Sequence, residues 1–196
     1  MPETSARQVG AIGELELLAA ETARDAQLYI ATVREVAAGA AADTAIPVLL
    51  LASAQLLLAG SRLGAVQDVV PDERFEPDAG PDADLESTRE SLHALLGGLD
   101  GYCDLEDPVL SGEVTDGSLS ADLVAIAHDL GHGLDHYRAG RATEAMWWWQ
   151  FSYLSSWGER AASALRVLLT LLAHVRLDAE AEDVMEAEMA ALHAVD

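Results

Sequence analysis

The sequence contains no lysine, so its 11 basic side chains are all arginine, against 34 aspartates and glutamates and a net charge of −23. A phosphate backbone is bound through clustered Lys and Arg side chains, so we expect no direct contact with nucleic acid. Asparagine is also absent, and a GC-rich genome or adaptation to salt explains both absences without reference to function. The functional alternatives are a partner with basic patches and mimicry of nucleic acid by the acidic surface.

Cysteine occurs once, at Cys103, which excludes an intrachain disulfide and fits a reducing compartment. The neighbouring Asp104 and Glu106 oppose formation of a thiolate, so we do not expect a nucleophilic cysteine. No basic N-terminal stretch precedes an apolar run, and we expect a cytoplasmic protein without a secretory signal. The most apolar run, residues 44–60, is interrupted by Pro47 and predicts a core helix rather than a membrane span.

Strand-forming residues are scarce as well, with two phenylalanines and four isoleucines, and no extended alternation of apolar and polar residues is present. Alanine and leucine, which favour helix, make up much of the 51% hydrophobic fraction. A chain of 196 residues has the length of one compact domain. We therefore predict an all-α, single-domain bundle of about six helices over residues 1–196.

Apolar periodicity and capping residues set the predicted boundaries. The predicted helices cover residues 5–38, 44–63, 85–99, 118–138, 145–172 and 178–195. An acidic, proline-rich loop at 67–84 and a second loop at 101–117 separate three of them. The second helix is apolar nearly all round, which predicts a central position. The short turn at Ala139–Gly140 predicts that the fourth and fifth helices pair as an antiparallel hairpin at the centre of the bundle.

The helix at 145–172 contains all four tryptophans, and the other helices are expected to pack on it. Its predicted core stripe follows steps of three and four residues and comprises Trp147, Phe151, Leu154, Gly158, Ala161, Leu165, Leu168 and Leu172. Three consecutive tryptophans point about 100° apart. At least one of them should therefore lie at a groove, beneath another helix or at an interface.

Three histidines of the fourth helix, His128, His132 and His136, are spaced four residues apart and share one side of the helix. Imidazoles at this spacing can chelate one divalent transition metal such as zinc, nickel or copper. No HExxH motif accompanies them, and histidine pairs at this spacing are common on solvent-facing helices. A solvent-facing stripe is therefore the main interpretation, and a metal site is the alternative.

Motifs for nucleotide binding or nucleophilic catalysis are absent: the sequence has no P-loop, GxGxxG, GxSxG or CxxC. Residues 119–171 do carry a distinctive pattern. It consists of Leu119-Ser120-x-Asp122-Leu123, Ile126, Asp129-Leu130, Gly133-Leu134, Tyr137, Ala145, Trp147-x-Trp149, Phe151-Ser152, Trp157-Gly158 and Ala164-Leu165-Arg166. This segment resembles the bacterial domain of unknown function numbered 5063, which occurs in actinobacteria and bacteroidetes. The resemblance implies a helical fold and no established activity. It leaves out the three histidines, and Arg160 and Ser163 depart from a usual histidine and aspartate.

The fourth and fifth helices together carry a polar and aromatic cluster. Its members are Asp122, Asp129, Trp149, Trp157, Arg160 and Arg166. The two aspartates lie two turns apart on one side of their helix, where an arginine of an antiparallel neighbour would form a bidentate ion pair that fixes the register. The alternative places this pair at the floor of a pocket walled by the two tryptophans, able to bind a small polar ligand.

These observations favour a cytoplasmic, non-enzymatic helical protein that acts through contact with a protein partner. The absence of catalytic motifs, the tryptophan-rich helix and the acidic composition all point in this direction. A small-ligand or metal site between the fourth and fifth helices is the second hypothesis, and nucleic-acid mimicry is the third. We expect no membrane association and no cofactor other than the metal considered above, and the sequence leaves oligomerisation open.

Overall fold

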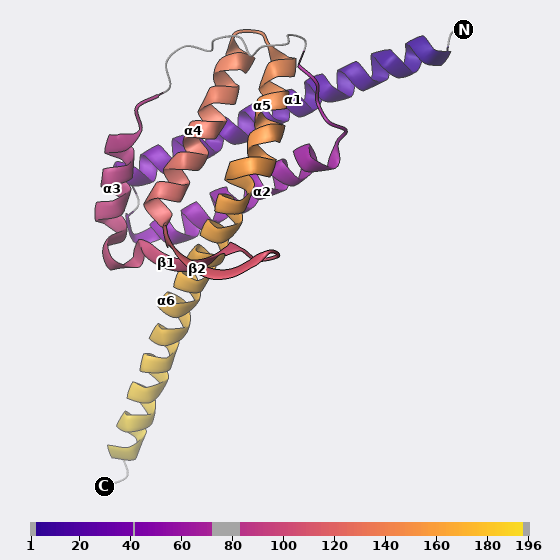
Figure 1. Ribbon diagram of the computed structural model, residues 1–196. Helices are drawn as coiled ribbons and strands as arrows, with labels where there is room; N and C mark the ends of the chain where they lie inside the picture. Colours follow the sequence, from indigo (N-terminus) through magenta and orange to yellow (C-terminus); the bar gives the residue numbers. More distant parts are fainter. Residues whose placement is uncertain (1–2, 41, 72–82, 194–196) are drawn as a thin grey trace.

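Figure 1 shows the computed structural model of the chain, which describes the backbone of residues 3–40, 42–71 and 83–193. Side chains are described for residues 13, 15–40, 43–71 and 83–177. Most of the predicted acidic loop at 67–84, and the side chains of the predicted last helix, lie outside these ranges.

The protein is mostly helical, as predicted, and the described residues also contain one two-stranded antiparallel sheet. The elements are α1 (Glu3–Ala37), α2 (Ala45–Ala65), α3 (Glu86–Leu96), β1 (Gly101–Asp107), β2 (Ser111–Ser118), α4 (Leu119–Arg138), α5 (Ala142–Ser152), a π-helical turn (Tyr153–Trp157) and α6 (Gly158–His193), with short 3-10 helices at Ala42–Thr44 and Gly97–Leu99. Because α5, the π-helical turn and α6 are continuous, the described chain has five helices rather than six. The predicted separate helix at 178–195 is the end of α6 as far as His193.

In Figure 1, α4 and α5 lie side by side in front of α1 and α2, with α3 beside α4 and the hairpin β1–β2 crossing the first part of α6. The core between these layers is built from the apolar stripes of the helices. Its largest fully buried side chains include Leu49 and Leu63 of α2, Leu92 of α3, Leu123, Ile126 and Leu130 of α4, and Trp149 and Trp157 of the long helix. The hydroxyl of Tyr29 on α1 donates to the carbonyl of Leu123, 3.4 Å away, and is satisfied within this core.

The helix α2 is buried on one side only, which differs from its predicted central position. Leu49, Leu56 and Leu63 face the core, whereas Leu51 and Leu58 are 60% and 57% exposed. An apolar composition all round the helix therefore reflects an aliphatic outer face and not burial on every side. By length and composition alone α2 would suffice to cross a bilayer, and 39% of its most apolar window is buried.

The π-helical turn changes which residues of the tryptophan-rich helix face the core. It inserts one extra residue relative to an α-helix, so the part before it is rotated by about 100° relative to the predicted stripe. Phe151 and Leu154 were predicted to be buried but are 51% and 68% exposed. Met146 and Gln150, each one residue before a member of the predicted stripe, are buried instead. The predicted stripe is therefore wrong before the turn and largely correct after it, where Gly158, Ala161 and Leu168 are buried and Leu165 and Leu172 are half-buried.

The segment predicted as a loop at 101–117 forms the hairpin β1–β2 instead. Its alternation is inverted, because Tyr102 and Asp104 face the helices while Cys103 and Leu105 face outward. A strand whose inner face meets a polar surface lacks the usual apolar-inside pattern. Asp116-Gly117, a dipeptide typical of turns, lies inside β2, with Gly117 opposite Tyr102. A Cβ at Gly117 would lie 2.3 Å from the ring of Tyr102, so only glycine lets this ring lie across the strand.

Candidate functional site

An ion pair between the half-exposed Arg160 and the buried Asp122 joins α6 to α4 beneath the hairpin. The Nη1 atom of Arg160 donates to Oδ1 of Asp122 at 2.8 Å, and the hydroxyl of Tyr102 donates to Oδ2 at 2.6 Å. Asp122 is 6% exposed and lies in the first turn of α4, where the positive end of the helix dipole favours a carboxylate. This carboxylate therefore connects three elements: β1, α4 and α6.

Two tyrosines adjoin this carboxylate, and burial is the main cause that keeps both neutral. Burial, and then the hydrogen bond to Asp122, raises the pKa of Tyr102 above its usual value of about 10. Complete burial, with a smaller contribution from the charge of Asp122, also raises the pKa of Tyr29. The phenol of Tyr102 therefore keeps its proton at neutral pH and donates it to Asp122.

An open cavity of about 340 Å³ lies between the hairpin and the long helix, with the ion pair in its wall. Its charged lining consists of Asp104, Glu106, Asp116, Asp122, Glu159 and Arg160, and the hydroxyls of Tyr102, Thr115, Ser155, Ser156 and Ser163 complete the polar lining. Five carboxylates against one guanidinium give the cavity a negative potential. Chemically, this arrangement suits a cationic group with several hydrogen-bond donors.

Asp129 lies away from this ion pair and has different partners. Its carboxylate accepts a hydrogen bond from Ser156 of the π-helical turn at 2.8 Å and lies 3.7 Å from Nδ1 of His128. Its backbone carbonyl accepts from Nε1 of Trp148 at 2.8 Å. The two aspartates of the predicted cluster are therefore not brought to one site. Of these two, only Asp122 pairs with an arginine among the described residues.

Arg166 binds the hairpin rather than α4. Its Nη2 atom lies 2.9 Å from Oδ1 of Asp104 and 3.4 Å from the carbonyl of Cys103. Burial opposes ionisation of Asp104, but hydrogen bonds from Ser163 and the amide of Leu105, together with Arg166, lower its pKa overall. The arginine predicted to meet an aspartate of α4 instead fastens β1 to α6.

The two tryptophans predicted as pocket walls are fully buried core residues. Nε1 of Trp149 donates to the carbonyl of Leu130 at 3.2 Å, and a Cβ at Gly133 would lie 2.1 Å from that nitrogen. The ring of Trp157 packs against that of Tyr153 in a tilted arrangement, with 4.8 Å between ring centroids and an interplanar angle of 56°. The pocket hypothesis is therefore corrected: the cavity is walled by hairpin and helix side chains, and neither of these tryptophans lines it.

The three histidines of α4 do not converge on a common point. His128 interacts with Asp129, the ring of His132 lies 4.2 Å from that of Trp148, and His136 is fully buried. Within the ranges that the structure describes, no three His, Cys, Asp or Glu side chains are grouped to hold a metal ion. The three histidines instead run from the half-exposed ring of His128 to the fully buried ring of His136.

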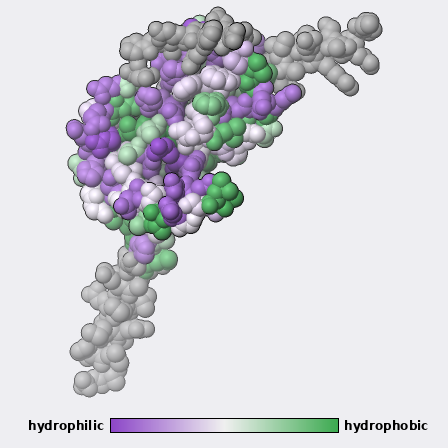
Figure 2. All heavy atoms as spheres, viewed as in Figure 1, coloured by the Kyte–Doolittle hydropathy of each residue, from purple (hydrophilic) through white to green (hydrophobic). Residues whose placement is uncertain are grey.

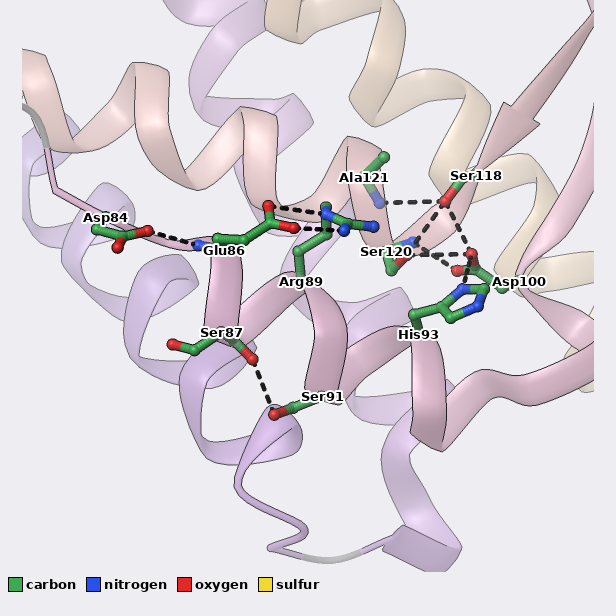
Figure 3. Close-up of polar contacts among 10 residues, drawn as sticks. All are labelled: Asp84, Glu86, Ser87, Arg89, Ser91, His93, Asp100, Ser118, Ser120 and Ala121. Atoms are coloured by element: carbon green, nitrogen blue, oxygen red, sulfur yellow. Dashed lines mark hydrogen bonds and ion pairs between the residues drawn. The ribbon is translucent and has the colours of Figure 1, made fainter.

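A separate polar clasp, shown in Figure 3, closes the base of the hairpin. The buried carboxylate of Asp100, just before β1, accepts hydrogen bonds from Ser118 Oγ at 2.8 Å, Ser120 N at 2.7 Å and Ser120 Oγ at 3.1 Å, and it lies 2.9 Å from His93 Nδ1. Burial alone would raise the pKa of Asp100, but these hydrogen bonds outweigh burial and lower it. The arrangement differs from a catalytic triad because both serines bind the carboxylate rather than the imidazole.

The tip of the hairpin is apolar and exposed. Val109 and Leu110 are 86% and 87% exposed, and their amides donate to Oδ1 of Asp107 at 2.7 and 2.8 Å, which fixes the turn. The tip is visible as the green projection at the right of Figure 2. Beside it, an open groove of about 620 Å³ runs between the hairpin and α6 and includes Val114 and Arg166.

The sequence reasoning missed the hairpin and with it the residues that build the cavity. Tyr102, Asp104 and Asp116 lie in a segment predicted as loop. Exposed and half-buried positions alternate along residues 101–105 in the structure, as in a strand with one covered face. The sequence carries no matching apolar alternation, because the half-buried positions are a tyrosine and an aspartate rather than aliphatic residues.

Comparison with known proteins gives the fold a context but no activity. A crystal structure of protein BF1032 from Bacteroides fragilis is similar, with a TM-score of 0.62 and 17% identity over 77% of this chain and 89% of that one. At this identity the likeness concerns the fold alone. No curated protein matches the sequence. The model of the family described as "Domain of unknown function (DUF5063)" matches residues 14–174, from α1 into α6, and the chain therefore belongs to this family.

Proposed function

We propose that the protein is a non-enzymatic, cytoplasmic binding module that docks a protein partner through the β1–β2 hairpin and the groove beside it. The observation that carries this proposal is the hairpin tip, where Val109 and Leu110 are almost fully exposed on a turn fixed by Asp107. Because hydrogen bonds already fix the backbone of this turn, it loses little conformational entropy when its exposed aliphatic side chains are buried in a complex. Such a tip is therefore suited to insertion into an apolar recess of a partner.

The charges around the tip favour a basic partner. Asp104, Glu106 and Asp116 lie on the strands that lead to the tip, and Glu159 faces them from α6. Together with the net charge of −23, they attract a basic segment and repel acidic ones. The proposed partner thus presents arginine or lysine side chains next to an aliphatic or aromatic anchor.

Two clasps hold the hairpin ready for docking. Asp100 closes its base, the pair of Asp104 with Arg166 fastens β1 to α6, and the hydroxyl of Tyr102 binds β1 to Asp122. The π-helical turn supports the same face, because it sets the rotation at which Arg160 emerges from α6. A partner would meet a preorganised surface, which lowers the entropic cost of association.

The experiment compares two short peptides, one alternating Arg and Leu and the other alternating Glu and Leu, by fluorescence anisotropy. We expect binding of the basic peptide only, weakened at least about tenfold by V109Q/L110Q at the tip. The control L51Q/L58Q removes the same kind of aliphatic surface from α2 and should leave the affinity unchanged. Equal affinity of wild type and tip variant, or no binding of the basic peptide, would refute the proposal.

A small cationic ligand is the second candidate, favoured by the 340 Å³ cavity beside Asp122 and Arg160. Guanidinium and polyamine compounds should then raise the melting temperature of the wild type but not of D116N.

Nucleic-acid mimicry is the third candidate function, with the carboxylates of the hairpin as its charged face. The predicted central hairpin of α4 and α5 is part of the proposed scaffold, supported by the bonds of Trp148 and Trp149 to α4 carbonyls.

A further inference from the structure

The outer face of α2 carries an aliphatic stripe that the hairpin proposal does not use. Val48, Leu51 and Leu58 follow each other at helical spacing and are 37%, 60% and 57% exposed. Leu28 of α1, 52% exposed, lies across a shallow groove of about 320 Å³ from Leu58. These four large aliphatic side chains lie on two neighbouring helices, with Gln55 among them in the groove, and they are called the α1–α2 face. Exposed aliphatic side chains that gather in this way are typical of interaction sites.

The charges bordering this face set it apart from the rest of the molecule. Arg62 lies 3.8 Å from Glu21, and Arg24 lies 3.8 Å from Asp25, so two arginines balance two carboxylates. The whole chain contains 11 arginines against 34 acidic residues. A local balance in such a chain makes the α1–α2 face a place where another strongly acidic molecule can approach without net repulsion.

We propose that the α1–α2 face is the interface through which two copies of this chain form a symmetric dimer. In a two-fold contact each copy presents the same patch, so Arg24 and Arg62 of one copy face the carboxylates Glu21 and Asp25 of the other. The aliphatic stripes then cover each other in the middle. The 21-residue helix α2 is about 32 Å long, which is long enough for the two copies to pack along it.

The other possible occupants of the α1–α2 face fit it less well. A basic partner would find more attraction at the carboxylates of the hairpin than at this balanced border. An anionic membrane surface repels a chain of charge −23 that has no lysine to anchor it. A second copy satisfies both the aliphatic stripe and the paired charges.

Sedimentation of the full chain over about a hundredfold range of concentration tests the dimer. We expect a monomer–dimer equilibrium that L51Q/L58Q weakens at least about tenfold, with unchanged helical circular dichroism because both side chains are exposed. The tip variant V109Q/L110Q is the matched control and should dimerise like the wild type. A wild type that stays monomeric, or a tip variant that loses dimerisation, would overturn the proposal.

A charge-swap experiment distinguishes contacts between copies from pairs within one chain. R24E/R62E alone and E21R/D25R alone should each be monomeric, because each places like charges opposite one another. Their mixture should recover a heterodimer, and a mixture that remains monomeric would contradict the charge pairing. Flotation of the wild type with neutral or anionic vesicles, abolished by L51Q/L58Q, would assign the face to lipid instead.

Discussion

Substitution of Gly133 by alanine provides a sharp test of how α4 packs against the tryptophan-rich helix. A Cβ at this position would lie 2.1 Å from Nε1, 2.5 Å from Cδ1 and 2.6 Å from Cε2 of Trp149. The indole is fully buried, and its Nε1 donates to the carbonyl of Leu130 at 3.2 Å. A rigid ring with core on every side has no direction in which to move, so the helices must separate or the hydrogen bond must break.

The expected change in the free energy of unfolding is the sum of two costs and one gain. Overpacking of a core costs about 1–3 kcal/mol, and loss of the indole hydrogen bond costs about 1 kcal/mol more. Replacing glycine by alanine inside a helix gains about 1 kcal/mol. We therefore expect G133A to lower the free energy of unfolding by about 1–3 kcal/mol, which for a chain of this size lowers the melting temperature by roughly 2–12 °C.

Gly131 supplies the matched control, because it lies one residue before His132 in the same helix and a Cβ there meets no atom within 4 Å. G131A should gain the helical preference without the clash and raise stability by up to about 1 kcal/mol. Both variants are compared with the wild type by urea unfolding, followed by circular dichroism and by tryptophan fluorescence. If G133A is as stable as G131A, the contact between Gly133 and Trp149 is wrong.

The ion pair and the clasp give further predictions. R160Q should cost about 1–2 kcal/mol, discounted for the partial exposure of Arg160, whereas R138Q, at the exposed pair with Asp135, should cost less than about 0.5 kcal/mol by urea unfolding. Because the folded pKa of Asp100 is lowered, its contribution to stability is present above its unfolded pKa of about 4 and is lost as the pH falls through the folded value. D100N should therefore destabilise the protein at neutral pH and approach the wild type in strong acid, and a constant difference across the pH range would contradict this. Y102F should remove no phenolate titration near pH 10, since the pKa of Tyr102 is raised; a loss of that titration by ultraviolet absorbance would place Tyr102 in solvent.

Helical periodicity predicted most of the fold because it reflects burial directly. Apolar residues at steps of three and four in α1 and α4, among them Tyr29, Leu123 and Leu130, are buried in the core. The α2 helix was harder, since an aliphatic outer face and a buried face give the same composition. Leu51 and Leu58 are exposed because packing alone, and not hydrophobicity, decides which side of such a helix meets the core.

The candidate site was only partly predictable. An arginine of the long helix does meet Asp122, because residues at helical spacing on adjacent helices have few possible neighbours. Arg166 instead meets Asp104, since β1 lies between it and α4, and no apolar pattern announced that strand. Residue types and helical spacing therefore indicate possible partners of an arginine. They do not show that a strand such as β1 packs against the helix and supplies a different partner.

The single extra residue in the π-helical turn restricts how the length of this helix can vary among related sequences. Trp149 before the turn and Arg160 after it are both held by α4, through Leu130 and Asp122 respectively. Deleting any one residue of Tyr153–Trp157 would rotate one of these side chains by about 100° relative to the other, so the two contacts could not coexist. Homologous chains that keep both contacts must keep this helix at constant length, while insertions should accumulate at the hairpin tip.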